Sequence, residues 1–302
     1  MEQHQNLTAR LQAAGIAYRE QEPLAAHTTF KIGGPAAVFV QPADEAQLCQ
    51  AVRLCRELAV PCYLLGNGSN ILFGDRGYAG AIVSLAGMKG EVRREGDTLT
   101  APAGMPLSVL CTAALRAGLT GLEFAYGIPG TVGGAVYMNA GAYGGEMKDV
   151  LASVRYLTAD GQIVEAPAAE LDLGYRHSVF ESNGGCILSA AVRLAPGDPE
   201  AIAARMDDLM GRRRDKQPLD KPSAGSTFKR PVGAFAGALI EQAGLKGASI
   251  GGAQVSPKHA GFIVNMGGAT AADVLALIAH VQREVLRASG VHLETEVRII
   301  GE

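Results

Sequence analysis

The sequence predicts a mixed fold in which an α/β part is joined to an α+β part, and three observations lead to this prediction. A strand, helix, strand order between residues 36 and 65 ends in a glycine turn, which is typical of an α/β layer. A hairpin pattern follows at 153–165, and helical periodicity alternates with short β-like runs toward the C-terminus. At 302 residues the chain is long enough for two or three domains, each with its own core.

Composition and charge narrow the class of protein. Apolar residues make up 48% of the chain and charged residues 19%, as in folded globular proteins. The net charge of -3 gives no basic surface for nucleic acid. No apolar h-region of a signal peptide follows the polar start, and no apolar run approaches the length of a membrane span. We therefore expect a cytoplasmic protein that binds neither nucleic acid nor a membrane.

The cysteines favour free thiols over cross-links. They are odd in number, lie within apolar patterns and show no paired C-x-x-C spacing. Buried thiols in a reducing compartment are expected in place of disulfides or a zinc site, and no metal ion is predicted. The residues concerned are Cys49, Cys55, Cys62, Cys111 and Cys186.

Capping residues and periodicity predict the elements of the first half. Asn6 can cap a short helix that Gly15 ends, and Gly118 stops another helix. The other predicted elements here are a strand at 36–40, a helix at 44–58, a strand at 63–65, short β-patterned runs between 81 and 103, and a helix at 106–117.

The second half alternates strands with helices. Asp160-Gly161 is a turn signal between two β-patterned runs, and residues 196–199 read as the clearest linker. The predicted elements are strands at 153–157, 162–165 and 186–194, a helix at 200–212, a helix at 233–243, a β-like run at 261–265, a helix at 271–289 and a final strand at 292–300. Alternation along that last strand places Glu294, Glu296 and Arg298 on one face.

A glycine-rich stretch from Gly127 to Glu146 is the most distinctive feature of the chain. Small apolar residues surround its seven glycines, and its only charge lies at its end. Glycine has no side chain to hold a ligand away and adopts positive φ, so main-chain N–H groups there can approach a bulky or anionic group. We take a nucleotide pyrophosphate as the favoured guest. The alternative is a tight loop packed in a crowded core.

A second glycine turn, from Gly66 to Leu72, follows the strand at 63–65. It is not a dinucleotide fingerprint of the G-x-G-x-x-G type, because Ile71 stands where a glycine is required, and it lacks the Gly-Lys-Ser/Thr of a Walker loop. It offers closely spaced backbone donors and three polar side chains, which suit an anion. Asn67-Gly68 is also a strong hairpin signal, so a type I′ turn is an equal alternative.

Polar groups interrupt apolar or glycine-rich contexts at three further places, which are Tyr175–Ser178, Ser223–Pro231 and Glu294–Ile300. Each also has a structural explanation, namely a surface arginine, a serine in a turn and a solvated strand face. The basic cluster of Arg212, Arg213, Arg214 and Lys216 at a helix C-terminus is explained equally well by the helix dipole and by phosphate binding.

Taken together, these motifs resemble the UDP-N-acetylenolpyruvoylglucosamine reductases, flavoenzymes of bacterial peptidoglycan synthesis. The resemblance spans nearly the whole chain through the ordered motifs Thr28–Gly34, Gly66–Asn70, Gly127–Gly145, Tyr175–Arg176, Ala224–Ser226, Gly251–Ser256 and Glu296–Arg298. It implies an FAD-binding domain of the vanillyl-alcohol-oxidase (PCMH) type, built of two α/β subdomains, and a C-terminal α+β substrate domain. The implied boundaries are 1–85, completed by a C-terminal strand at 291–302, then 86–198, and 199–290 for the substrate domain.

The reaction that the resemblance implies is the NADPH-dependent reduction of UDP-N-acetylglucosamine enolpyruvate to UDP-N-acetylmuramate through bound FAD. NADPH gives a hydride to FAD and leaves, and the reduced flavin passes it to the enolpyruvyl β-carbon. The negative charge that develops on the α-carbon and carboxylate is stabilised by Arg176 and Glu296, and Ser226 gives the proton to the α-carbon. A monomer is expected.

The remaining site residues are carried over from the same resemblance. Contacts to the cofactor are implied for Gly66, Asn67, Gly68, Ser69, Asn70, Ile71, Gly127, Pro129, Gly130, Thr131, Gly133, Gly134, Ala140, Arg213 and Arg298. Contacts to the substrate are implied for Tyr175, Lys216, Lys229 and Gln254, with Lys216 at the substrate diphosphate.

The chain departs from the family pattern in two ways, and two other functions compete with the family reading. Arg230 stands where some relatives have Asn, and the segment from Arg176 to Arg212 is too short for the tyrosine-bearing loop of longer members, so this chain resembles the shorter type. A sugar-lactone oxidase of the same flavin-binding type would share the glycine loops but lack the motifs at 224–226 and 296–298. A non-catalytic nucleotide-sugar binding protein would bind no flavin.

Overall fold

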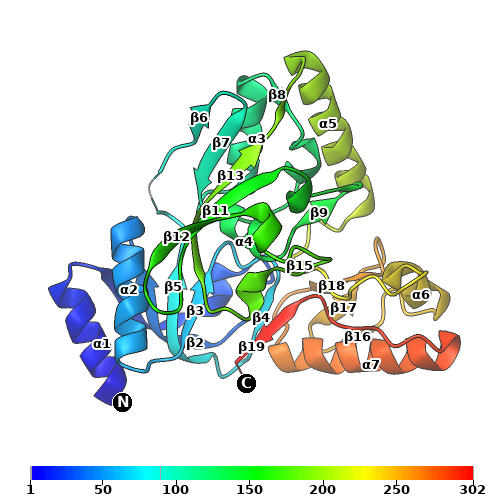
Figure 1. The fold of residues 1–302 in the computed structure, drawn as a ribbon. Helices are drawn as coiled ribbons and strands as arrows, with labels where there is room; N and C mark the ends of the chain where they lie inside the picture. The colour runs from blue at the N-terminus through cyan, green and yellow to red at the C-terminus, as the bar shows by residue number, and fades with distance from the viewer. Residues whose placement is uncertain (1, 89, 302) are drawn as a thin grey trace. The chain divides into compact units, whose positions relative to one another are not determined.

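Residues 2–88 and 90–301 are described by a computed structural model (Figure 1). Contacts within the chain divide it into two units. The first unit comprises Met1–Arg19, Val38–Asn67 and Ala81–Arg213. The second comprises Glu20–Ala37, Gly68–Gly80 and Arg214–Glu302. Both units are therefore assembled from segments far apart in the sequence. The predicted division at residues 85, 198 and 290 has different boundaries and stays a prediction.

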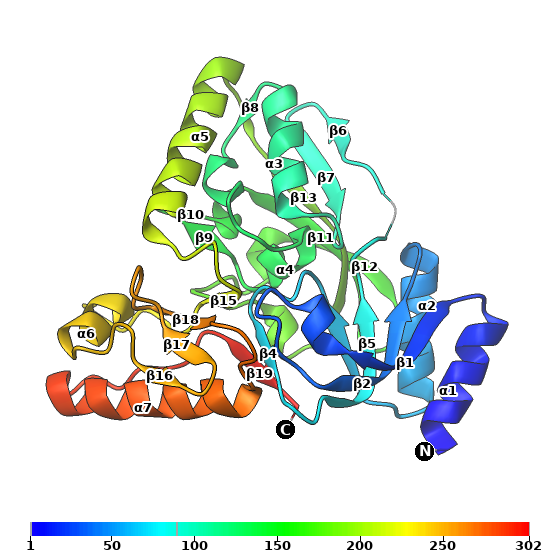
Figure 2. The same ribbon diagram turned by 180° about the vertical axis from the view of Figure 1, so that it is seen from behind.

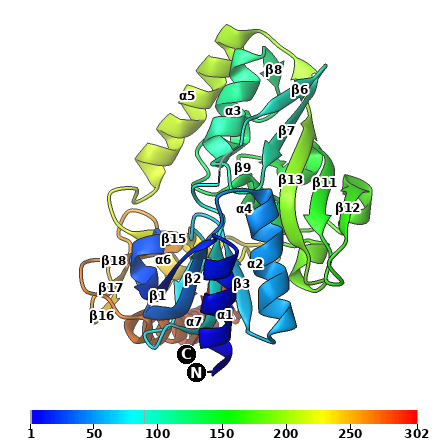
Figure 3. The same cartoon turned by 90° about the vertical axis from the view of Figure 1, so that its left-hand side faces the viewer.

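The N-terminal layer of the first unit is the predicted strand, helix, strand arrangement. Its sheet has the order β1-β2-β5-β3, and β3 runs parallel to β5. The elements are α1 (Glu2–Ala13), β1 (Ala17–Pro23), β2 (Pro35–Gln41), α2 (Glu45–Glu57), β3 (Cys62–Leu65) and β5 (Tyr78–Ser84). Asp44 caps α2 by accepting a hydrogen bond from the Gln47 N–H at 2.9 Å, as its short acceptor side chain favours. Helices α1 and α2 lie side by side (Figure 3).

The larger sheet of the first unit is antiparallel and has the order β12-β11-β13-β7-β6. The predicted hairpin at Asp160-Gly161 is confirmed, since β11 and β12 pair from Ser153 with Pro167 to Leu157 with Ile163. The strands and helices of this part are β6 (Arg93–Glu95), β7 (Thr98–Pro102), α3 (Leu107–Arg116), β8 (Leu119–Thr120), α4 (Val132–Tyr137), β9 (Gly141–Ala142), β10 (Gly145–Glu146), β11 (Leu151–Leu157), β12 (Ile163–Pro167), β13 (Cys186–Arg193), β14 (Ala195–Pro196) and α5 (Pro199–Lys216). Figure 2 shows α3 beside β7.

One hydrophobic core runs through both sheets of the first unit. It takes Leu48 from α2, Leu99 from β7, Val154 from β11 and Met206 from α5, and each of these side chains is buried. Burial of apolar surface on this scale, about 25 cal/mol per Å² removed from water, is what holds sequence-distant segments together.

The second unit is a four-stranded sheet with two helices and a separate strand pair. The sheet has the order β15-β18-β17-β16, and α7 lies along β16 and β17 (Figure 1). The elements are β4 (Ile71–Phe73), β15 (Ser223–Ser226), α6 (Ala236–Gln242), β16 (Ser249–Ile250), β17 (Ala253–Val255), β18 (Phe262–Asn265), α7 (Ala271–Ser289) and β19 (Arg298–Ile300). Asp75 accepts hydrogen bonds from the Ala271 and Ala272 N–H groups at 2.7 and 2.9 Å, a favourable place for a negative charge.

Short 3-10 turns connect several of these elements. They lie at Leu24–His27, Glu123–Ala125, Met147–Asp149, Ala168–Glu170 and Val179–Glu181. The last of them directly follows Ser178.

The structure corrects three predicted elements. The first helix begins at Glu2, four residues before the expected cap Asn6. The expected linker at 196–199 is not an open connection, because β14 pairs with β8 up to Pro196 and α5 begins at Pro199. The Pro and Gly residues at 196–199 form a tight connection, because both residue types occur in turns as well as in linkers.

The third correction concerns the C-terminal strand, which is confined to 298–300 and pairs in parallel with β4. Residues 292–297 contribute only an isolated bridge between Thr295 and Phe228, and Leu293 and Val297, four residues apart, are the buried positions. The expected alternation of faces along 292–300 is therefore wrong, and Ile299 within the strand is 41% exposed.

Candidate active site

The glycine-rich stretch contains the N-terminus of α4, and the main chain there is packed closely against neighbouring segments. Its first N–H groups donate to protein acceptors: Val132 to the Met105 carbonyl at 2.9 Å, Gly133 to the Ala103 carbonyl at 2.8 Å and Gly134 to the Thr131 hydroxyl at 3.2 Å. A Cβ on Gly133 would lie 2.8 Å from the Ala103 Cβ. Close packing therefore accounts for this glycine, as the crowded-core alternative expected.

The two glycine motifs meet in the first unit. The Asn67 side-chain amide donates to the Pro129 carbonyl at 2.6 Å. A Cβ on Gly66 would lie 2.6 Å from the Thr131 Oγ1, so only glycine allows the two segments to approach this closely. Four predicted cofactor contacts, Gly66, Asn67, Pro129 and Thr131, are thus brought together.

The rest of the Gly66–Leu72 turn, from Gly68 on, belongs to the second unit. Gly68 has φ of +60°, and a Cβ there would collide with the His27 carbonyl, so glycine is required on both grounds. The Asn70 side chain donates to the Glu296 carbonyl at 3.2 Å, and the Asn70 carbonyl accepts from the Arg298 N–H at 3.0 Å. This turn is consequently joined to two predicted site residues, Glu296 and Arg298.

The type I′ hairpin alternative for Asn67-Gly68 is wrong. The strand before the turn, β3, pairs with β5, and the strand after it, β4, pairs with β19. A hairpin would require β3 and β4 to pair with each other.

Arginines suited to phosphate lie beside these turns in both units. In the first unit, a Cβ on Gly127 would lie 3.0 Å from Nη1 of Arg213, and burial lowers the pKa of this guanidinium. Nη1 of Arg213 and Nε of Arg298, the latter in the second unit, are both shielded from solvent. A buried guanidinium favours an anionic partner with planar, two-point geometry. The donor set in each unit therefore fits a dinucleotide pyrophosphate.

The Tyr175–Arg176 motif forms the tip of a tight turn in the first unit. Gly174 and His177 exchange two backbone hydrogen bonds of 3.1 and 3.2 Å. Arg176 has φ of +54°, a conformation that costs a residue with a Cβ about 1–2 kcal/mol, so the surroundings must hold it. The Arg176 guanidinium lies 5.1 Å from the Tyr175 ring centroid, and its Nη2 donates to the Gly141 carbonyl at 3.3 Å.

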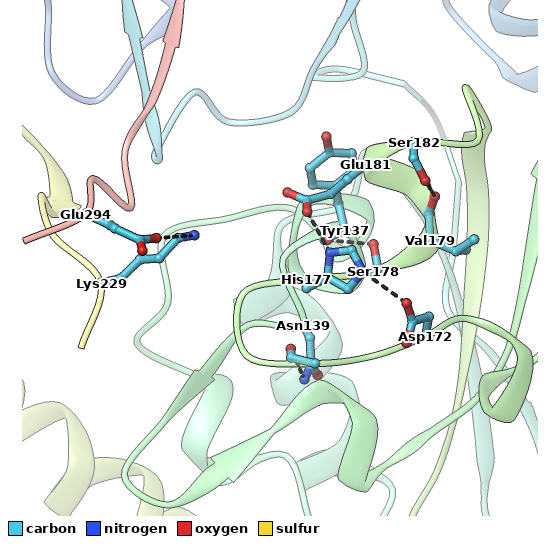
Figure 4. A network of polar contacts seen from close by, with 11 residues as sticks. Tyr137, Asn139, Asp172, His177, Ser178, Val179, Glu181, Ser182, Lys229 and Glu294 are labelled. Carbon is cyan, nitrogen blue, oxygen red and sulfur yellow. Dashed lines mark hydrogen bonds and ion pairs between the residues drawn. The ribbon is translucent and has the colours of Figure 1, made fainter. Parts of the chain in front are cut away.

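His177 fastens the flank of this turn to two carboxylates. Its Nδ1 lies 2.7 Å from Glu181 Oε2 and its Nε2 lies 3.2 Å from Asp172 Oδ2 (Figure 4). Hydrogen bonds to Glu181 first and Asp172 second raise the pKa of His177 above its ordinary value, because both partners favour the imidazolium.

The proposed proton donor, Ser226, ends strand β15 of the second unit. The register between β15 and β18 shifts between Ser223 and Ser226, and Gly225 has φ of +75°. Such a bulge turns the following side chain away from the regular pleat. The Glu296 N–H donates to the Thr227 carbonyl at 2.8 Å, so the segments of Ser226 and Glu296 are neighbours.

The expected substrate residues are partly engaged with other protein groups. Lys229 Nζ lies 3.4 Å from Glu294 Oε2 (Figure 4), and the Gln254 side chain donates to Ser249 Oγ at 3.0 Å within the β16–β17 hairpin. Lys216, at the end of α5, is exposed. The guanidinium of Arg230, the residue that departs from the family pattern, lies 4.6 Å from the Phe235 ring centroid.

Two buried polar residues of the site were given no role from the sequence. Asn139 and Ser178 are both fully buried; Asn139 donates to the Gly174 carbonyl beside the Tyr175–Arg176 turn, and Ser178, just after the turn, donates to the Tyr137 carbonyl. The signal was present, since Asn139 is the only amide within the glycine-rich stretch and Ser178 ends the Tyr175–Ser178 segment. A buried polar side chain is recognisable only once its burial is known.

Known proteins and protein families match this chain over most of its length. Residues 217–300 match the model of the UDP-N-acetylenolpyruvoylglucosamine reductase C-terminal domain, and residues 36–167 match an FAD binding domain. The reductase of Clostridium perfringens is 49% identical over 292 residues, which cover 95% of this chain and 96% of the relative. That of Clostridium botulinum is 50% identical over 281 residues, covering 93% and 92%.

A solved structure supports the same relationship. The reductase of Thermus caldophilus superposes with a TM-score of 0.80 at 36% identity, covering 94% of this chain and 98% of the other.

Among the helices of residues 2–88 and 90–301, none has the length and apolar character needed to cross a membrane.

Proposed function

Since the chain belongs to the UDP-N-acetylenolpyruvoylglucosamine reductase family and is an FAD-dependent oxidoreductase of the predicted flavin-binding type, we propose that it makes UDP-N-acetylmuramate for peptidoglycan synthesis with NADPH as reductant. The observation that carries this proposal is identity near 50% with named reductases over more than nine-tenths of the chain. We further propose that the protein works as a monomer in the cytoplasm.

A bound flavin would supply the chemistry of hydride transfer between NADPH and the β-carbon of the enolpyruvyl group. The chain's own part is to hold the dinucleotide. The first unit offers Asn67, Thr131 and the buried guanidinium of Arg213 for this, and the second offers the Gly68–Ile71 turn with Arg298. Glycines at 66 and 127 keep side chains away from these groups.

Arg176 binds the carboxylate of the enolpyruvyl group in this proposal. A guanidinium keeps its charge at every working pH and presents a fork of donors that matches the two carboxylate oxygens. Charge that develops on the carboxylate during hydride addition strengthens this pairing, which therefore contributes more in the transition state than in the ground state. Its position at the tip of a tight turn suits a group that must be presented to a ligand.

Ser226 and Glu296 complete the addition. The hydride makes the new bond at the β-carbon, the electron pair of the double bond moves toward the α-carbon and carboxylate, and the Ser226 hydroxyl gives its proton to the α-carbon. A serine is a weak acid, so the transfer requires direct contact and a route for reprotonation. The hydrogen bond from Glu296 N–H to the Thr227 carbonyl keeps Glu296 beside the serine segment. Its carboxyl group can stabilise the developing negative charge there only by donating or sharing a proton.

The competing functions explain fewer observations. A sugar-lactone oxidase would account for the FAD domain match at 36–167 but not for the reductase domain match at 217–300. A non-catalytic nucleotide-sugar binder would account for the basic cluster but has no need of a flavin domain. Both alternatives remain outcomes of the experiment below.

The decisive experiment is an anaerobic titration of the purified yellow protein, followed by its visible spectrum. NADPH should bleach the flavin, and UDP-N-acetylglucosamine enolpyruvate should restore the colour while UDP-N-acetylmuramate forms. Bleaching without recovery would point to another flavoenzyme. A colourless protein that cannot be loaded with FAD would overturn the flavin assignment.

The role of Ser226 is tested separately with Ser226→Ala. The variant should keep the rate of flavin reduction by NADPH, while reoxidation by the substrate should slow by about 10²–10⁴-fold, the usual contribution of positioned proton transfer. Ser223→Ala, which alters the other serine of β15, serves as the matched control and should behave as the parent. Normal reoxidation in Ser226→Ala would remove this residue from the mechanism.

A further inference from the structure

The turn that carries Arg176 contacts the segment Tyr137–Gly141, which begins at the end of α4 and lies within the glycine-rich stretch. Three alternate residues of this segment make the contacts. The Tyr137 carbonyl accepts from the Ser178 hydroxyl at 2.7 Å, Asn139 Nδ2 donates to the Gly174 carbonyl at 2.9 Å, and the Gly141 carbonyl accepts from Arg176 Nη2 at 3.3 Å. The turn is therefore fastened before its tip, at its tip and after it.

Asn139 is the centre of this arrangement. It is fully buried and has φ of +38°, which a non-glycine residue adopts rarely. Its Nδ2 also donates to Glu146 Oε2 at 2.7 Å, and its Oδ1 accepts from the Lys148 N–H at 2.8 Å. Both ends of the amide are thus used, and the donor end reaches both the arginine turn and the β10 edge. A carboxylate of the same shape would lose the donors and face Glu146 with a like charge.

Ser178 fastens the other side of the turn. Its side chain is fully buried, and its hydroxyl makes the hydrogen bond to Tyr137 from the residue directly after His177 (Figure 4). Because Arg176 is held in a left-handed conformation, it needs surroundings that fix the backbone on both sides.

From this geometry we infer that Asn139 and Ser178 are positioning residues for the reduction step, which act by fixing the backbone turn that presents Arg176. This inference rests on the proposed role of Arg176 in binding the substrate carboxylate. Loss of either hydrogen bond leaves the Arg176 side chain chemically intact. The turn can then shift, and the guanidinium moves away from its productive position. A displacement of about 1 Å in a catalytic group lowers a rate by about 100-fold.

The test separates the two half-reactions in single-turnover, anaerobic experiments, with rates expressed per bound flavin. Ser178→Ala and Asn139→Asp should reduce their flavin with NADPH within about twofold of the parent rate, but reoxidation by UDP-N-acetylglucosamine enolpyruvate should slow by about 10- to 100-fold. Ser182→Ala is the matched control, because its exposed hydroxyl donates to the Val179 carbonyl, at 3.4 Å, within the same segment (Figure 4). It should match the parent in both steps.

A double-mutant cycle distinguishes positioning from a general loss of structure. In an Arg176→Ala background the effect of Ser178→Ala on reoxidation should disappear, since the group that it positions is already gone. A penalty that persists in that background, or equal losses in both half-reactions, would overturn the inference. Ser178→Ala removes one hydroxyl only, so the test stands if Asn139→Asp does not fold.

Failure of the proposed function gives a different result. If Arg176→Ala itself reoxidises at the parent rate, Arg176 has no role in the step and the proposed mechanism fails. If Arg176→Ala is slow while both Ser178→Ala and Asn139→Asp match the parent, the proposed mechanism stands and the positioning inference alone is wrong.

Discussion

Gly127→Ala is expected to weaken FAD binding without destabilising the protein. A Cβ at this position would lie 3.0 Å from Nη1 and 3.1 Å from Cδ of Arg213, which is closer than ordinary van der Waals contact. Gly127 is not among the glycines with positive φ, so its backbone accepts alanine. The methyl group must therefore displace the guanidinium that we assign to the cofactor phosphate.

The structure gives the size of both effects. Overpacking usually costs about 1–3 kcal/mol, but here the neighbour is the end of a flexible side chain that can move aside. Alanine has less conformational entropy than glycine in the unfolded chain, which stabilises the folded protein by about 0.4–1 kcal/mol. The free energy of unfolding should therefore change by less than about 1 kcal/mol. A hydrogen bond to a charged group contributes about 1.5–3 kcal/mol, and losing its geometry should raise the Kd for FAD by about 10-fold or more.

The assay is fluorescence titration of the apoprotein with FAD, alongside thermal unfolding. Gly211→Ala is the matched control: it lies within α5 two residues before Arg213, and nothing lies within 4 Å of the added Cβ. It should leave the Kd unchanged and stabilise the helix by about 0.5–1 kcal/mol. An unchanged Kd in Gly127→Ala would refute the assignment of Arg213 to the cofactor. A further loss on adding Gly127→Ala to Arg213→Ala would show that the methyl group meets the cofactor directly.

Two further predictions follow from the titrating groups. Hydrogen bonds to Glu181 and Asp172 raise the pKa of His177, so its ion pairs stabilise the fold fully below the unfolded pKa of about 6.5 and lose that effect as pH rises through the higher folded-state pKa. The excess Tm of the parent over His177→Gln should therefore be largest near pH 5.5 and shrink steadily as the pH is raised above about 6.5. A constant Tm difference across that range would contradict this. Burial raises the pKa of Cys111 and of Cys186 to about 12, so both remain protonated and unreactive near pH 8. Alkylation of the native protein at this pH should therefore leave both thiols unmodified, whereas the denatured chain should react at all five cysteines. Peptide mass spectrometry identifies the modified residues. Rapid native labelling of either would show that it is accessible as a thiolate.

Local patterns determined most of the elements correctly. The helices at Glu45–Glu57, Leu107–Arg116 and Ala271–Ser289 lie where capping and 3.6-residue periodicity placed them, because both signals are contained in neighbouring residues. The strand at 292–300 failed for the opposite reason: its apparent alternation is local, but burial there is decided by Leu293 and Val297 against the core of the second unit.

The glycines show most clearly where sequence reading stops. Their number marked 127–146 and 66–72 as special, and the ordered motifs were sufficient to indicate the family, because residue identity and spacing are properties of the chain alone. The sequence does not show which glycines make room for a ligand and which make room for another part of the chain. Gly133 is required by Ala103, Gly66 by Thr131 and Gly68 by the His27 carbonyl, all contacts between distant segments.

The sequence by itself determined the fold class, the family and the identity of the candidate catalytic groups. Only the tertiary structure decided how those groups are supported: that Asn70 bonds to Glu296, and that Asn139 and Ser178 hold the turn of Arg176. The physical reason is that hydrogen bonds and burial depend on distances between segments that are far apart in the chain, and a one-dimensional pattern does not contain those distances.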